Sequence, residues 1–146
     1  MIKVIKIGGN VVDNPELLRE FVRDFAAMPG MKVLVHGGGV MASQMQKAMG
    51  MVPQMVEGRR VTDEETLKVV TMVYAGWCSK HITALLQAEG CNAVGLSGAD
   101  GNAIKAAKRA PVPSNVLPLI FYINDFQNPI RYITDYQCQT IGRAFY

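Results

Sequence analysis

Short apolar runs and longer helical stripes follow one another along the first half of the chain. Residues 2–7 (IKVIKI) predict a short buried strand, and residues 32–35 (KVLV) predict a second strand. Between them, residues 17–25 carry apolar side chains at helical spacing. Asn14 offers an N-cap oxygen for this helix, and Pro15 suits its first helical position. The segment therefore predicts a strand, a helix and a second strand.

The pattern continues with more helix than strand. Residues 40–49 predict a short helix rich in methionine, and residues 51–60 predict an irregular or hairpin-like segment. Thr62 to Glu65 form a capping box with Thr62 as the N-cap, which opens a long helix to about Glu89. Residues 92–96 (NAVGL) predict a third strand. Alternation of this kind favours an α/β fold, a three-layer α-β-α sandwich with a mostly parallel central sheet.

The composition and the apolar pattern of the chain change near Pro111. Four of the seven prolines lie between Pro111 and Pro129, and beyond residue 110 the only recognisable pattern is a short strand at 117–123. We therefore divide the chain into one region over residues 1–110 and a divergent tail over residues 111–146. The tail is either an irregular C-terminal cap or a segment that was not selected together with the rest.

Composition excludes several classes of protein. A length of 146 residues, 49% of them hydrophobic, fits one globular domain. No apolar run approaches the roughly 20 residues of a membrane span, so no membrane association is expected. The net charge of +3 includes no dense basic stripe, which argues against nucleic-acid binding. Three cysteines, an odd number, suit a reducing compartment and predict a cytoplasmic protein.

Two glycine clusters each follow a predicted strand, at Gly8-Gly9 and at residues 36–39 (HGGG). Glycine lets backbone N–H groups approach a ligand closely, and a loop that opens a helix attracts anions. In a parallel sheet both loops would lie at the carboxyl ends of the strands, where ligands usually bind. Lys6, inside an apolar strand, would need an anionic partner. Together these residues predict a site for phosphate.

Other chemistries fit less well. The chain contains neither GxxxxGK[ST] nor GxGxxG, which argues against a P-loop enzyme or a Rossmann dehydrogenase. The HGGG segment and Ser97, in a GLSGA sequence, are similar to parts of a hydrolase site, but no histidine follows His81 in the chain. Cys78 and His81 have no second pair at ligand spacing, so no metal site is predicted.

Four motifs in register resemble acetylglutamate kinase, of the amino-acid kinase superfamily. They are KIGG at 6–9, HGGG at 36–39, GRRVT at 58–62 and NAVGLSGADG at 92–101. The resemblance covers about residues 1–110 and implies the N-terminal, substrate-binding lobe of an amino-acid-kinase-like (carbamate-kinase-like) fold. It implies ATP-dependent phosphorylation of the side-chain carboxylate of N-acetyl-L-glutamate in arginine biosynthesis, with ATP and Mg²⁺ as cofactors.

The resemblance also implies roles for individual residues. Lys6 would stabilise the transferring phosphoryl group, and Gly8 and Gly9 would bind the phosphates through their amides. Gly38 and Gly39 would contact the acylated amino acid, and Arg60 would hold its α-carboxylate. Family members are typically homodimers through the long helix, which makes residues 67–86 the expected self-association face.

Family members are roughly twice as long as this chain, and their second half supplies the nucleotide-binding lobe. We therefore expect a truncated or frame-shifted chain whose own activity is in question. Two alternatives stay open. One is acetylaminoadipate kinase of lysine biosynthesis, which is similar over the same residues. The other is a non-catalytic lobe that binds an acyl-amino acid.

Overall fold

The computed structural model describes residues 2–56, 59–104, 107–108 and 121–122. Its sheet begins with β1 (Lys3–Lys6) and β2 (Lys32–Val35), which pair in parallel with Lys6 opposite Val35. Both strands were predicted, but the expectation that β1 is buried was wrong: three of its four residues are exposed, because the core packs against one face of the strand only. Ile5 and Leu34 turn towards the apolar core, whereas Val4 on the other face of β1 stays exposed.

Two helices connect these strands, and one of them was not predicted. α2 (Pro15–Ala27) begins where expected, because the Asn14 side chain accepts hydrogen bonds from the backbone N–H groups of Glu16 and Leu17. The single turn α1 (Gly9–Val12) precedes it, at residues that the sequence analysis treated only as a break after the strand. The Gly8-Gly9 loop therefore opens a helical turn directly.

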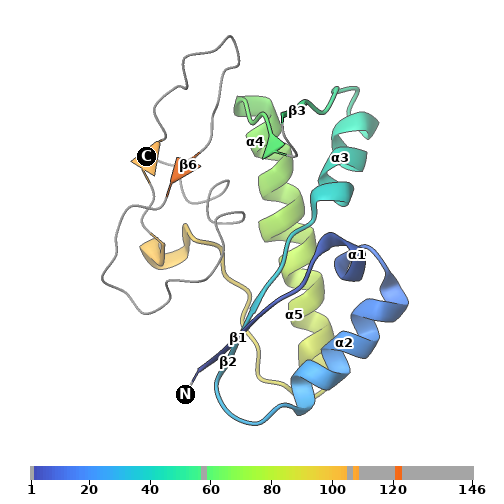
Figure 1. Ribbon diagram of the computed structural model, residues 1–146, viewed down its shortest axis with the longest axis vertical. Helices are drawn as coiled ribbons and strands as arrows, with labels where there is room; N and C mark the ends of the chain where they lie inside the picture. The colour runs from blue at the N-terminus through green and yellow to red at the C-terminus, as the bar shows by residue number, and fades with distance from the viewer. Residues whose placement is uncertain (1, 57–58, 105–106, 109–120, 123–146) are drawn as a thin grey trace.

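The middle of the chain follows the predicted order. α3 (Gly39–Ala48) is followed by β3 (Met55–Val56) and β4 (Arg59–Arg60), a short antiparallel hairpin. The long helix is continuous but has three parts, α4 (Glu64–Thr71), the π-helical turn η1 (Met72–Cys78) and α5 (Ser79–Ala88). Figure 1 shows this long helix with α3 beside its first half and α2 beside its second half.

The capping box at the start of the long helix was assigned to the wrong residue. Asp63 is the N-cap, and its carboxylate accepts the backbone N–H of Thr66 at 2.8 Å. Thr62 instead donates its hydroxyl to the carbonyl of Arg60. Asp63 lies one residue further along and is an equally good N-cap type, so local sequence does not separate the two.

The third strand predicted at residues 92–96 is not formed. This segment is irregular, and two of its carbonyls bind side chains of α5: Ala93 accepts from Gln87, and Gly95 accepts from Lys80. A strand needs a neighbouring strand to satisfy its backbone groups, and here side chains satisfy two of them. The short 3₁₀ turn η2 (Asp100–Asn102) follows.

Beyond residue 104 the structure describes only β5 (Ala107–Lys108) and β6 (Phe121–Tyr122), which pair antiparallel. β6 lies within the strand predicted at 117–123, and the other residues of that prediction lie outside the described part of the chain. The predicted boundary near residue 110 lies outside it too and stays a prediction.

The core forms where the long helix meets α2, α3 and one face of the β1–β2 sheet. Its buried members include apolar side chains from these helices and from the residue that follows β1 (Ile7, Leu18, Val22, Phe25, Ala42, Val69, Val70, Val73, Ile82 and Leu86). The parallel sheet packed against helices confirms the α/β class. Among the described residues, no helix has the length and hydropathy of a membrane span.

Candidate functional site

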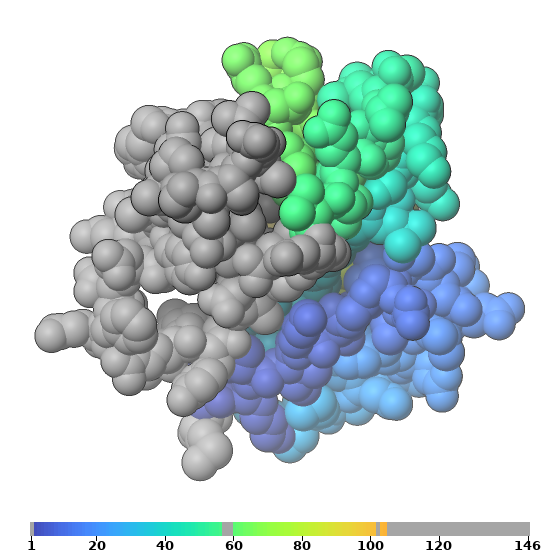
Figure 2. Space-filling model, turned by 45° about the horizontal axis from the view of Figure 1, so that its top comes forward, coloured from blue at the N-terminus to red at the C-terminus, as the bar shows by residue number. Residues whose placement is uncertain are grey.

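A cleft of about 390 Å³ opens at the carboxyl ends of β1 and β2. Residues 6–9 and 35–40 line one side of it, and Ser43, Met55 and Arg60 line the other. Figure 2 shows the face of the molecule where the N-terminal segment (blue) and the region of α3 (teal) meet. The cleft is therefore formed by segments that are far apart in the sequence.

Parallel pairing brings the two glycine loops to the same edge of the sheet. The ladder continues one residue past β1, because the backbone N–H of Ile7 donates to the carbonyl of Val35 at 2.9 Å. Both chains then leave the sheet together, and each loop opens a helix. The loops consequently face one cavity, as the sequence predicted from strand direction.

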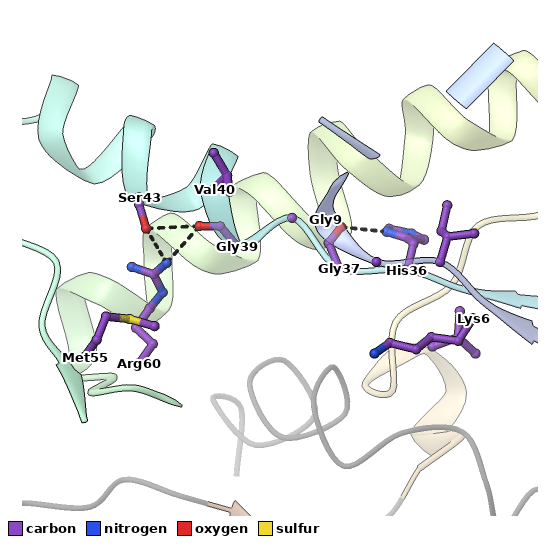
Figure 3. A pocket seen from close by; sticks show the side chains of 13 residues that line it. Lys6, Gly9, His36, Gly37, Gly39, Val40, Ser43, Met55 and Arg60 are labelled. Carbon is purple, nitrogen blue, oxygen red and sulfur yellow. Dashed lines mark hydrogen bonds between the residues drawn. The ribbon is translucent and has the colours of Figure 1, made fainter. Parts of the chain in front are cut away.

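All six residues predicted for the site line this cleft: Lys6, Gly8, Gly9, Gly38, Gly39 and Arg60. In Figure 3 Lys6 lies at one end of the cleft and Arg60 at the other, with the loop at residues 37–39 between them. Lys6 is the last residue of β1, on the exposed face of the strand. A single ligand with anionic groups at both ends could therefore contact both cations.

The glycine loops present main chain without side chains. Gly8 and Gly38 are the N-caps of α1 and α3, and Gly9 and Gly39 are the first residues of these helices. The N–H groups at a helix start have no intrahelical acceptor. They are thus available to oxygen atoms of a ligand in the cleft.

Gly38 is also required by packing. A Cβ atom at this position would lie 2.8 Å from the Cys78 sulfur and 3.0 Å from the Tyr74 ring. Both neighbours come from the π-helical turn η1, so the long helix supports the loop from behind. At Gly39 a Cβ atom would meet nothing within 4 Å.

Arg60 is held in place by α3. Its Nη2 donates to the carbonyl of Gly39 at 3.0 Å and to the Ser43 hydroxyl at 2.7 Å, and its Nη1 donates to the Gln46 side-chain oxygen. A guanidinium carries five N–H donors, so these three acceptors do not exhaust it. Arg60 keeps donors for a ligand while its position is fixed.

Gln46 is a residue of this site that the sequence analysis missed. Its side chain is 1% exposed, and its amide donates to the hydroxyl of Thr66 in α4 at 3.0 Å. Because a polar side chain on a short amphipathic helix is usually exposed, the sequence carried no signal that Gln46 would be buried.

Burial also changes the titration of groups near the loops. It lowers the pKa of His36, which lines the cleft, against the opposing effect of a hydrogen bond with the Gly37 carbonyl. It raises the pKa of the Cys78 thiol to about 11. Burial likewise raises the pKa of the Tyr74 hydroxyl, more than the neighbouring Arg60 lowers it. At neutral pH these three groups are therefore uncharged.

Asp13 is a further acidic group below the first loop. One of its carboxylate oxygens is buried without a hydrogen-bond partner, 3.3 Å from the position that a Cβ atom on Gly9 would take. Burial raises the pKa of this carboxyl. Among the described residues, no group of three or more His, Cys, Asp or Glu side chains is placed to hold a metal ion.

Comparison with known protein families identifies the fold. The family model described as the amino acid kinase family matches residues 1–137. This chain belongs to the amino acid kinase family. The match extends beyond residue 110, where the sequence resemblance was expected to end.

Curated relatives of this chain are named acetylglutamate kinase. The proteins from Cytophaga hutchinsonii and Parabacteroides distasonis are each 55% identical to it over 106 residues, which is 73% of this chain and 40% and 42% of theirs. The protein from Methanopyrus kandleri is 44% identical over 123 residues, which is 84% of this chain and 47% of the relative. The chain thus spans less than half the length of these three relatives.

A solved structure shares the fold. N-acetylglutamate synthase from Neisseria gonorrhoeae, in complex with coenzyme A and N-acetyl-glutamate, superposes with a TM-score of 0.59 and 24% identity. The match covers 77% of this chain and 26% of the synthase chain. At this identity the likeness concerns the fold alone.

Proposed function

We propose that this chain forms the substrate-binding lobe of an acetylglutamate kinase that uses ATP to phosphorylate the side-chain carboxylate of N-acetyl-L-glutamate. The observation that carries the proposal is that Lys6, both glycine loops and Arg60 line one cleft. The name that the curated relatives carry, acetylglutamate kinase, supports the same substrate. Arginine biosynthesis, which the sequence resemblance implies, is part of the same proposal.

The chemistry requires positioning more than acid–base catalysis. A side-chain carboxylate oxygen of the substrate forms a bond to the γ-phosphorus, and the bond from that phosphorus to the bridging oxygen breaks, with its electron pair leaving on ADP. The attacking carboxylate is already ionised at neutral pH, so no base is needed. The difficulty is repulsion between two anions, which Lys6 and the loop amides of Gly8 and Gly9 would reduce.

In this proposal Arg60 binds the α-carboxylate of the substrate, at the opposite end of the cleft from Lys6. The guanidinium is fixed by α3 and keeps free N–H donors. Gly38 and Gly39 lie between the two cations and would contact the acylated amino acid. The substrate would then span the cleft with its reacting carboxylate towards Lys6.

ATP fits the same site through its phosphates. The residues that would hold them are Lys6 and the amides of Gly8 and Gly9, which face the cleft together. Mg²⁺ would enter bound to the phosphates, since the described residues offer it no cluster of acidic or histidine ligands. When bound, the nucleotide supplies the phosphoryl group.

A hydroxamate assay for acyl phosphate, with ATP, Mg²⁺ and N-acetyl-L-glutamate, tests the proposal. We expect turnover that Lys6→Ala reduces by at least about a hundredfold, an effect typical of removing one group that stabilises transition-state charge. Lys3→Ala is the matched control, because Lys3 is also an exposed lysine of β1 but lies outside the cleft. Equal activity of both variants would contradict the role of Lys6.

A second candidate function needs only the residues that would bind the acylated amino acid, the loop at residues 37–39 and Arg60, which line the same cleft. In this proposal the lobe binds the acyl-amino acid without turnover, alone or with another subunit. Calorimetry that detects binding of N-acetyl-L-glutamate in the absence of any acyl phosphate would favour it. Tighter binding of N-acetyl-L-2-aminoadipate would favour the acetylaminoadipate kinase alternative instead.

We also propose a cytoplasmic homodimer that associates through the long helix. Met72 and Trp77 of η1 are 53% and 60% exposed, and such apolar side chains are common at interfaces. Sedimentation of the wild type and of Trp77→Glu tests this proposal. If the wild type is a dimer and Trp77→Glu is a monomer, the long helix forms the dimer interface. If Trp77→Glu is still a dimer, Trp77 is not part of the interface.

A further inference from the structure

Gln46 occupies an unusual position beneath the cleft. It is a buried polar side chain whose oxygen accepts from Arg60 and whose nitrogen donates to Thr66. It therefore links the guanidinium at the mouth of the cleft to the first half of the long helix. A buried amide normally persists only when its partners satisfy it, and here both ends have a partner.

This link determines where Arg60 can lie. Arg60 belongs to the short hairpin strand β4, which by itself provides little support for a long side chain. Three acceptors of α3 hold its end group: the Gly39 carbonyl at the start of the helix, the Ser43 hydroxyl one turn along, and Gln46 about one turn further. The Tyr74 hydroxyl of η1 contacts the same guanidinium. Ser43 in turn donates to the Gly39 carbonyl at 3.0 Å, so the acceptors themselves are ordered.

We propose that Gln46 is a positioning residue that holds Arg60 in the orientation needed to bind a carboxylate group in the cleft. The inference rests on the proposed function for the identity of the ligand, but not for the position of Arg60. Prior fixation matters because a guanidinium recognises a carboxylate through directed hydrogen bonds, and ordering it only on binding would weaken the affinity.

The test compares two ligands that differ only at the carboxylate that Arg60 would bind. N-acetyl-L-glutamate carries the α-carboxylate, and 4-acetamidobutyrate is the same molecule without it. Calorimetry on the full chain gives the ratio of the two affinities, which measures the contribution of that carboxylate. Gln46→Met keeps the volume of the side chain but removes both hydrogen bonds, and Gln44→Met is the matched control on the exposed face of α3.

We expect Gln46→Met to reduce the ratio about tenfold, as for loss of a hydrogen bond to a charged group, and Gln44→Met to leave it unchanged. Thr66→Val removes the distant anchor of Gln46, together with the contact of the Thr66 hydroxyl with the Asp63 carboxylate. It should reduce the ratio less and provides the test if Gln46→Met does not fold. In an Arg60→Lys background, Gln46→Met should have little further effect. A ratio unchanged in Gln46→Met, or equal weakening of both ligands, would overturn the proposal.

An NMR measurement separates this inference from the proposed function. In the wild type we expect slow rotation of the Arg60 guanidinium, observed through its nitrogen-bound protons, and fast rotation in Gln46→Met without any ligand. If the wild type binds neither ligand, the proposed function fails, while the change in rotation still supports Gln46 as the residue that holds Arg60. Rotation that is equally slow in both proteins would overturn the inference.

Discussion

The two cations of the cleft have different surroundings. Lys6 is exposed at the end of β1, whereas Arg60 donates to three acceptors of α3. A lysine is a flexible point charge that can follow a phosphoryl group as it moves. An arginine is a rigid planar group that fixes the direction of a carboxylate. The arrangement suits a site with one stationary anion and one that is transferred.

At the residue scale, His36 makes stability depend on pH. Burial lowers its pKa from the usual 6.5, so the folded protein keeps it neutral where the unfolded chain begins to bind a proton. The contribution of His36 is therefore present above about pH 6.5 and is lost as the pH falls towards its folded value, with a slope of at most about 1.4 kcal/mol per pH unit. Urea unfolding at several pH values between about 7.5 and 5 measures this slope.

His36→Gln should make that slope shallower, because glutamine does not titrate. His81→Gln is the control, since His81 is the other histidine and lies exposed on α5. An identical pH dependence in the wild type and His36→Gln would show that His36 contributes nothing to it.

At the scale of elements, the loop before α3 depends on close contact with the long helix. Gly38→Ala would place a methyl group 2.8 Å from the Cys78 sulfur and 3.0 Å from the Tyr74 ring. Overpacking of this kind costs about 1–3 kcal/mol in the free energy of unfolding. Gly39→Ala should be neutral or stabilising, because it adds a methyl group in open space within a helix. Urea denaturation of both variants distinguishes them, and equal stability would contradict the contact.

The N-cap of the long helix provides a second prediction at the scale of elements. Asp63→Ala removes the N-cap and should lower stability by about 1 kcal/mol. Because the hydrogen bond from Thr66 lowers the pKa of Asp63, its contribution is present above about pH 3.8 and is lost as the pH falls further.

Glu65→Ala is the matched variant for this cap, since a capping box would have used Glu65. In the structure Glu65 instead pairs with Lys68 on the exposed surface at 2.7 Å, where solvent screens the two charges, so the contact adds little to stability. Thermal and urea unfolding should therefore show the larger loss in Asp63→Ala. A larger loss of stability in Glu65→Ala would instead indicate that Glu65 caps the helix start, as in the predicted capping box.

At the scale of the whole molecule, the cleft joins segments that the sequence separates. Its lining comes from the end of β1, both glycine loops, α3 and the β3–β4 hairpin. A ligand that contacts Lys6 and Arg60 together would link the sheet to the hairpin. Binding would consequently oppose unfolding of the whole domain, not only the opening of one loop.

This link predicts stabilisation by N-acetyl-L-glutamate. At a concentration of about 100 times its Kd, a ligand of the folded state adds about 2.7 kcal/mol to the free energy of unfolding. We expect the unfolding midpoint to rise with ligand concentration in thermal and urea titrations, and to rise less in Arg60→Lys. N-acetyl-D-glutamate at equal concentration, which carries the same charge, controls for ionic effects. A midpoint insensitive to N-acetyl-L-glutamate would contradict binding in this cleft.

Sequence alone determined the features that depend on short stretches of chain. The N-cap at Asn14, the strands at the start of the chain and the glycine loops after them follow from backbone preferences and from the spacing of apolar residues. Parallel strand direction then brought the two loops together, so the six predicted residues were found in one cleft. Local rules suffice here because each acts within a few residues.

Only the tertiary structure decided which of several possible partners each group takes. It capped the long helix with Asp63, left residues 92–96 outside the sheet and buried Gln46 between Arg60 and Thr66. Each outcome depends on contacts between segments distant in sequence, where small differences in packing and hydrogen-bond free energy choose between locally equivalent alternatives. For this reason the anions that the cleft would bind were suggested by the sequence, whereas the support of Arg60 became visible only in the folded chain.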